Sequence, residues 1–145
     1  MKRLSVSVKT LNELAIIPKY QTDEAAGFDL HSVDEKVIKA GGRDVIKTGL
    51  AFALPKGYEL QVRPRSGLAL KNGITVLNTP GTIDSDYRGE LMVILINTSK
   101  DDFFVNSGDR IAQAVIKEVL QADFCIVEEL DETVRGSNGF GSTGK

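Results

Sequence analysis

The stretch VIKTGLAFAL at residues 45–54, followed by PKG at 55–57 and YELQVR at 58–63, decides the fold class of this chain. In residues 58–63 polar and apolar side chains alternate, which is the period of a half-buried β-strand. Residues 45–54 are predicted to form a strand as well. The proline, lysine and glycine between the two runs are typical of a turn. The chain is therefore expected to consist of strands joined by short turns.

The same pattern continues on both sides of this unit. Further strands are predicted at residues 4–9, 91–96 and 111–116, and turn signals lie at residues 40–42, 97–99 and 106–109. One helix of about two turns is expected over residues 66–73, with Ser66 as its N-cap and Gly73 as its stop. Because long segments with a helical period are absent, we expect an all-β sandwich, barrel or jelly roll with one short helix.

Composition limits the classes of protein to which the chain can belong. It has 145 residues, of which 41% are hydrophobic and 26% charged, as expected of a single globular domain. Its net charge of −2 gives no general attraction for nucleic acid or a membrane, and no apolar run approaches the length of a membrane span. The basic N-terminus is followed by an alternating segment rather than an apolar run, so no signal peptide is expected.

The single cysteine and the single histidine are both given non-catalytic interpretations. Cys125 lies in the apolar stretch 124–127, and because free cysteines are usually buried it is expected in the core. One thiol cannot form an internal disulfide, so a reducing cytoplasm is the simplest setting. His31 has no second histidine to pair with in a metal site and no serine partner for a triad, so we expect it to be structural or exposed.

The last eleven residues, RGSNGFGSTGK at 135–145, differ from the rest of the chain. Their glycines let the backbone approach a ligand, and Arg135 offers a planar fork suited to phosphate. Ser142 and Thr143 add hydroxyl groups, and Phe140 is a single aromatic with no local core to join. An aromatic ring among phosphate-binding groups suits a nucleotide. On the residues alone, a ligand-binding tail and a disordered tail remain equally open.

Two internal stretches carry further candidate chemistry. In RPRSG at residues 63–67, arginines and a serine stand at the start of the expected helix, which favours an anion site over an ordinary cap. In NTPGTIDSDYRG at 78–89, Asp84 and Asp86 are two residues apart and are expected to face the same side of an extended chain. Asp84 follows apolar Ile83 and is the candidate for partial burial and for a general base, although a polar turn is an equal alternative.

Two shorter stretches give weaker signals. AGFDL at residues 26–30 places Asp29 between apolar neighbours, and GDRIAQ at 108–113 opens a strand on which Gln113 shares a face with Ile111. Taken together and in this order, the five stretches match the five motifs of the trimeric dUTPase family, which the chain resembles from Ala26 to Gly144. One such motif would be suggestive, whereas five in order are specific.

The resemblance implies a fold and an assembly. The subunit is expected to be a β jelly roll, or β-clip barrel, spanning residues 1–134, followed by a flexible tail at 135–145. Three copies are expected to form a homotrimer with active sites at the subunit junctions. The second and fourth motifs of one site then come from one chain and the third from its neighbour. The tail of the remaining chain closes over the site.

The resemblance also implies a reaction and a role for each motif. The family hydrolyses dUTP to dUMP and pyrophosphate by attack of water at the α-phosphorus, which supplies dUMP for thymidylate synthesis and keeps uracil out of DNA. Asp84 is expected to activate the water and to contact the sugar 3′-hydroxyl, while Tyr87 packs on deoxyribose and excludes the ribose of UTP. Phosphate contacts are implied for Arg65, Ser66, Gly67 and Gln113, and contacts near uracil for Asn78 and Met92. In the tail, Arg135, Ser142 and Thr143 are expected to hold the γ-phosphate, with Phe140 stacked on uracil. Thr82, Ile83 and Gly141 are expected to bind the substrate as well.

Mg²⁺ is the implied cofactor. It binds phosphate oxygens while keeping several waters, so few direct protein ligands are needed. Asp29 is the candidate for holding metal-bound waters rather than the metal itself. Two alternatives remain: a dCTP deaminase, which resembles this family in fold and nucleotide, and a regulatory protein that binds dUTP without turnover.

Overall fold

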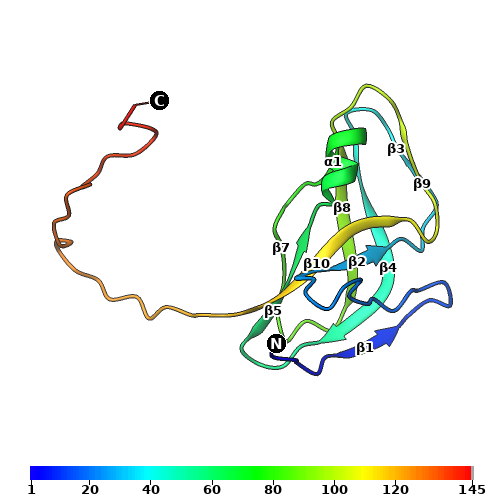
Figure 1. The fold of residues 1–145 in the computed structure, drawn as a ribbon, viewed down its shortest axis with the longest axis horizontal. Coiled ribbons are helices and arrows are strands. Elements are labelled where there is room, and N and C mark those ends of the chain that lie inside the picture. Colours follow the sequence, from blue (N-terminus) through cyan, green and yellow to red (C-terminus); the bar gives the residue numbers. More distant parts are fainter. Residues whose placement is uncertain (145) are drawn as a thin grey trace.

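The computed structural model describes residues 1–144, and Lys145, the last residue of the expected tail, lies outside them. Within this range the chain forms ten strands and one short helix, followed by an extended C-terminal arm (Figure 1). The elements in order are β1 (Ser7–Thr10), β2 (Phe28–His31), β3 (Lys36–Ile38), β4 (Arg43–Ala53), β5 (Tyr58–Arg63), α1 (Ser66–Asn72), β6 (Ile74–Val76), β7 (Gly81–Ile83), β8 (Glu90–Asn97), β9 (Phe103–Val105) and β10 (Arg110–Glu118).

The strands form two four-stranded antiparallel sheets and a two-stranded ribbon. One sheet has the order β1-β4-β8-β6, the other has the order β2-β10-β5-β7, and β3 pairs with β9. Strand β8 alternates between buried and outward-facing residues along most of its length, as expected of a strand with one face on a core. The core between the sheets is mainly aliphatic and includes Leu30, Ile46, Leu60, Leu95 and Ile111, each at most 1% exposed. The expected all-β architecture with one helix is therefore confirmed.

The longer predicted strands are confirmed with close boundaries. The prediction for residues 58–63 coincides with β5, and those for 45–54, 91–96 and 111–116 fall on β4, β8 and β10. The segment at 4–9 differs, because β1 begins at Ser7 and all four of its residues are exposed. Strand β1 lies at the edge of its sheet, where it pairs with β4 alone. The alternation corresponds to a partly buried face only before the strand begins, where Leu4 and Val6 are half-buried and Val6 packs against the core.

The short helix α1 ends as expected but begins differently. Gly73 takes the left-handed conformation at φ 63°, and its N–H reaches the carbonyls of Ala69 and Leu68, which closes the helix. The prediction that Ser66 is the N-cap is wrong, because Ser66 is already helical. Arg65 occupies the cap position without a side-chain hydrogen bond. None of the helix residues is buried, and Leu70 is 87% exposed.

The C-terminal arm leaves the body after β10. The N–H of Val119 still bonds to the carbonyl oxygen of Gly57, and residues 120–144 then extend away without forming a helix or strand (Figure 1). The division expected between residues 134 and 135 falls within this arm. Cys125 is exposed on the arm, so its prediction as a core residue is wrong: the apolar run 124–127 does not pack on its own subunit. Among the described residues, no helix is long and apolar enough to cross a membrane.

Candidate active site

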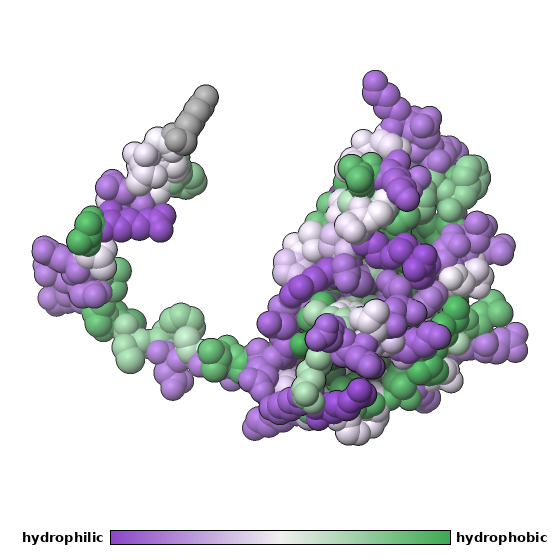
Figure 2. Space-filling view, in the orientation of Figure 1, coloured by the Kyte–Doolittle hydropathy of each residue, from purple (hydrophilic) through white to green (hydrophobic). Residues whose placement is uncertain are grey.

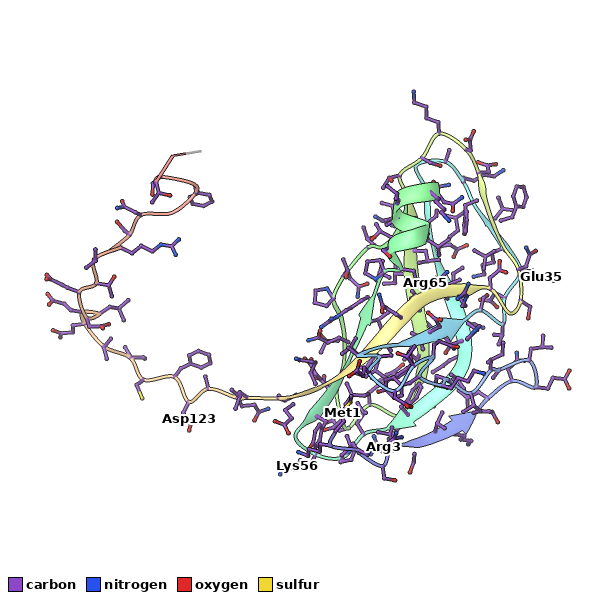
Figure 3. All side chains as sticks on the ribbon, in the orientation of Figure 1. Met1, Arg3, Glu35, Lys56, Arg65 and Asp123 are labelled. Atoms are coloured by element: carbon purple, nitrogen blue, oxygen red, sulfur yellow. The ribbon has the colours of Figure 1, made fainter. Side chains whose placement is uncertain are left out.

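An acidic side chain lies between two arginines where β2, β10 and the start of α1 meet. Asp29 on β2 places Oδ1 3.5 Å from Nε of Arg65 and Oδ2 3.7 Å from Nη1 of Arg110, and its side chain is 17% exposed. Arg65 also donates from Nη1 to the carbonyl of Arg110 at 3.1 Å. Figure 3 shows Arg65 at the base of α1 beside β10. The fold thus brings together residues from the first, second and fourth of the five stretches.

Gln113 joins this cluster from the middle of β10. It pairs with Asp29 on one side and with Arg63 on the other, and its Nε2 donates to the carbonyl of Pro64 at 3.0 Å. Gly27 gives this side chain its space, because a Cβ at residue 27 would lie 2.9 Å from Oε1 of Gln113. Beside it, Ser66 and Gly67 are exposed in the first turn of α1. Hydroxyl, amide and guanidinium donors therefore converge on one exposed surface, which suits an anionic ligand.

Arg110 is a member of this cluster that the sequence analysis did not single out. It opens β10 directly after the turn at residues 106–109, and its backbone pairs with His31 across the sheet. The available signal was its place in the GDRIAQ stretch, three residues before Gln113. His31 is half-buried, as its structural interpretation allows. Burial lowers the pKa of its imidazole below 6.5 against the opposing charge of Asp29, and the two arginines add to the lowering.

The third stretch lies on a different part of the subunit. Asn78 is exposed in the loop that connects β6 to β7, two strands that belong to different sheets. Thr82 is exposed on β7, and Ile83 beside it is half-buried. Asp84 follows directly after β7 and is exposed, so the expected partial burial is not found in the single subunit. The expectation that Asp84 and Asp86 face one side of an extended chain is wrong. The N–H of Tyr87 bonds to the carbonyl of Asp84 at 3.2 Å, so both carboxylates belong to a turn.

The two groups of residues are separated by the length of a strand. Strand β7 is antiparallel to β5 with Ile83 opposite Leu60, so Asp84 lies toward the beginning of β5. Arg65 lies beyond the other end of β5. At roughly 3.4 Å per residue, the five steps from Leu60 to Arg65 correspond to roughly 17 Å. Within one subunit, Asp84 and Arg65 are therefore too far apart to contact the same reacting phosphate. Met92, on the outward face of β8, is 42% exposed.

The tail residues are remote from both groups. Arg135 donates from Nε to the carbonyl of Asn138, and Ser142 donates its N–H to that of Gly139. These are local turns within the arm. Phe140 is fully exposed with φ 51°, and Gly141 and Thr143 are exposed beside it. In the described part of the chain, no group of three or more His, Cys, Asp or Glu side chains could hold a metal ion by itself.

Known proteins match this chain over nearly its whole length. The model of the dUTPase family matches residues 13–144. The chain belongs to the dUTPase family. The deoxyuridine 5′-triphosphate nucleotidohydrolase of Helicobacter hepaticus is 61% identical over 144 residues, which cover 99% of this chain and 91% of that protein. Its match therefore extends through both the body and the arm.

Solved dUTPases of staphylococcal phages share the fold. A mutant of the bacteriophage 80alpha dUTPase with dUpNHpp superposes with a TM-score of 0.86 at 27% identity, covering 97% of this chain and 99% of that one. A mutant of the phage phi11 dUTPase, in which a structural Mg(II) ion is coordinated, gives a TM-score of 0.82 at 26% identity, covering 88% and 99%. The β jelly roll expected for this dUTPase is therefore confirmed.

Proposed function

We propose that this dUTPase hydrolyses dUTP to dUMP and pyrophosphate by attack of water at the α-phosphorus, with Mg²⁺ as cofactor. Family membership and the nucleotidohydrolase name of the Helicobacter hepaticus relative support the reaction. The single observation in the structure that carries it is the cluster of Arg65, Arg110 and Gln113 around Asp29, which gathers donors for a polyphosphate. The net charge of the whole chain is −2, so it does not attract an anionic ligand. Binding of a triphosphate therefore depends on this local cluster.

The phosphate-binding part of the proposed site is Arg65, Ser66, Gly67 and Gln113. Arg65 is held by Asp29 and by the carbonyl of Arg110, so its guanidinium is oriented before the ligand arrives. Orientation in advance reduces the entropy lost on binding. Phosphoryl transfer is catalysed mainly by positioning and by neutralising charge, and both are what this cluster can provide.

The second part of the proposed site is the loop between β6 and β7, strand β7 and the turn after it. Asp84 is the proposed base that orients and activates the attacking water, and its side chain is exposed at the surface of the subunit. Tyr87 is proposed to pack flat on deoxyribose, so that a 2′-hydroxyl does not fit. Asn78, Thr82, Ile83 and Met92 are proposed to surround uracil, where a close fit excludes the thymine methyl group.

The proposed Mg²⁺ is compatible with the residues at the cluster. Both oxygens of Asp29 lie 3.5 Å or more from the nearest arginine nitrogens, so they retain acceptor capacity for water molecules. Oxygen ligands and retained waters are what Mg²⁺ prefers. When bound to the phosphates, Mg²⁺ would neutralise their charge, and Asp29 would hold its waters without contacting the metal directly. A water-mediated role needs no larger group of protein ligands.

We further propose that three copies form a homotrimer that shares its active sites. The separation of Asp84 from Arg65 supports this, because a second chain can bring its Asp84 to the first chain's arginine. The subunit surface supports it as well. Val45, Ile94 and Leu77 form a row across β4, β8 and the end of β6, and each is at least 36% exposed. An apolar row on the outside of a sheet is suited to burial against another copy.

The arm gives independent support for exchange between subunits. Leu120, Phe124 and Ile126 are each more than 90% exposed, and they follow the period of a strand with one apolar face. Figure 2 shows the arm standing clear of the body with apolar groups along it. In the proposed trimer this segment packs on a neighbouring copy, and residues 135–145 act as a lid that closes over a neighbour's site. We propose the cytoplasm as its location, where Cys125 stays reduced.

The reaction is tested by measuring the release of pyrophosphate from dUTP in the presence of Mg²⁺. The same measurement is made with UTP, dTTP and dCTP, and each nucleotide is assayed with the wild type and with Asp84→Asn. We expect release from dUTP alone, and its near-complete loss in Asp84→Asn because the amide cannot accept the proton. Ammonia release from dCTP would instead indicate a deaminase. Tight dUTP binding without any turnover would indicate a regulatory protein. Either result would overturn the proposed function.

A further inference from the structure

The ring of Tyr87 lies directly against the backbone of Gly89. A Cβ built at residue 89 would lie 2.6 Å from Cζ and 3.0 Å from Cε2 of that ring, and closer still to its hydroxyl oxygen. These contacts are too short for any real side chain. Gly89 does not have a positive φ, so its backbone does not require glycine. The absence of a side chain at residue 89 therefore serves the position of the ring.

Three hydrogen bonds hold Tyr87 in the same place. Its hydroxyl donates to the carbonyl of Glu90 at 3.0 Å, and its N–H bonds to the carbonyl of Asp84 at 3.2 Å. Its own carbonyl accepts from Nη1 of Arg88 at 3.0 Å, and the same nitrogen reaches the carbonyl of Ser85 at 2.6 Å. The residue is thus folded back over its own chain with 42% of its surface exposed.

A methyl group at residue 89 would act on the hydroxyl end of the ring. The overlap involves the hydroxyl oxygen and the carbon that bears it, which are the atoms beside the hydrogen bond to Glu90. The ring could avoid the overlap only by moving its hydroxyl end, and this would break that bond. A ring without this hydrogen bond can move when another group presses against it. A ring excludes a larger ligand by steric overlap only when it cannot move out of the way.

We propose that Gly89 is a positioning residue that sets sugar selectivity by fixing the ring of Tyr87. The inference rests on the proposed function, in which that ring packs on deoxyribose and excludes a 2′-hydroxyl. Gly89 itself touches no substrate. Its contribution is the space that lets the hydroxyl end of the ring lie against the main chain and bond to the carbonyl of Glu90. Selectivity between dUTP and UTP therefore depends on a residue outside the sugar contact.

The test is a double-mutant cycle with Gly89→Ala, Tyr87→Ala and both together, in the full-length chain. The measured quantity is the ratio of kcat/KM for dUTP to that for UTP. We expect Gly89→Ala to lower this ratio by roughly tenfold or more, the size of a lost steric contact. In the Tyr87→Ala background, adding Gly89→Ala should leave the ratio unchanged. The control is Gly41→Ala, which adds a methyl group in open space at φ 72° and strains the backbone without touching Tyr87.

Stability provides a readout that does not depend on catalysis. Gly89→Ala should lower Tm by roughly 2–4 °C when Tyr87 is present and have little effect when Tyr87 is alanine. Additive Tm changes in this cycle would overturn the inference even if the chain did not hydrolyse dUTP. An equal loss for both substrates, with an unchanged ratio, would also overturn it. A wild type that hydrolyses no dUTP would instead overturn the proposed function, and the stability cycle would still decide the contact.

Discussion

Deleting residues 135–145 should abolish most of the activity while leaving the body of the subunit stable. In the structure, the described part of this tail makes only local turns, and Phe140 is fully exposed. Exposed residues without contacts to the body contribute within about 0.5 kcal/mol to stability. The free energy of unfolding of the truncated chain should therefore match that of the full chain.

The loss of activity follows from the two main groups that are removed. A hydrogen bond from the charged Arg135 contributes about 1.5–3 kcal/mol. Stacking of Phe140 on a base contributes about 1–3 kcal/mol. Together they give at least about 2.5 kcal/mol, which corresponds to a fall in kcat/KM of roughly 70-fold. Phe140→Ala removes the stacking contribution alone and should fall between the wild type and the truncated chain.

The assay is pyrophosphate release from dUTP over a range of concentrations, beside urea unfolding of the same three proteins. An undiminished kcat/KM after truncation would refute the reasoning, because the tail would then take no part in the site. A large loss of stability would refute it in a different way. It would mean that the tail supports the packed body rather than the bound ligand.

Two further predictions concern stability. Asn97 is fully buried and makes four hydrogen bonds, two from Nδ2 to the carbonyls of Ile38 and Asp101 and two accepted by Oδ1 from Ser99. Asn97→Ala should lower the free energy of unfolding in urea by about 2–4 kcal/mol, and Ser99→Ala by much less; equal losses would contradict this. The pKa of His31 in the folded state lies below 6.5, so between these two pKa values the unfolded chain binds more protons than the folded chain. The free energy of unfolding should therefore fall as the pH drops from 7.5 to 5.5. His31→Gln should make this fall shallower, since the chain has one histidine; identical slopes would exclude His31 as the cause.

The sequence predicted the elements whose signal is local. Alternation over six residues defines β5, and Gly73 marks the end of α1 through its own backbone conformation. The short strands β2, β6 and β7 were not predicted, because three or four residues carry too little periodicity. These strands are stabilised by pairing with strands from other parts of the chain. Asp29, for example, is held opposite Gln113 by pairing of β2 with β10.

In the candidate site, too, only the features with a local signal could be predicted from the sequence. The residues of each motif were found from the sequence, but their relative positions were not. The alternation that placed Asp84 and Asp86 on one face assumed an extended chain, whereas a turn begins where β7 ends. The apolar neighbours of Cys125 favour burial, but composition does not say whether the same subunit offers a surface on which they can pack, and in the structure it does not. Arg110 could not be predicted as a site residue, because it belongs to the site through its contact with Asp29, and its neighbours along the chain do not indicate that contact.

A single folded chain presents Val45, Ile94 and Leu77 to water, together with an arm that carries exposed apolar side chains and forms no helix or strand in its described part. Apolar patches promote aggregation, and exposed segments without secondary structure are preferred sites of proteolysis. In the proposed trimer a neighbouring copy covers these surfaces, so the chain is most exposed to proteolysis after its body has folded and before it assembles. The rate of assembly rises with concentration. Cleavage of a single chain does not accelerate in this way, so a larger fraction of the chains should escape proteolysis when they are made together in a short burst than when they are made slowly.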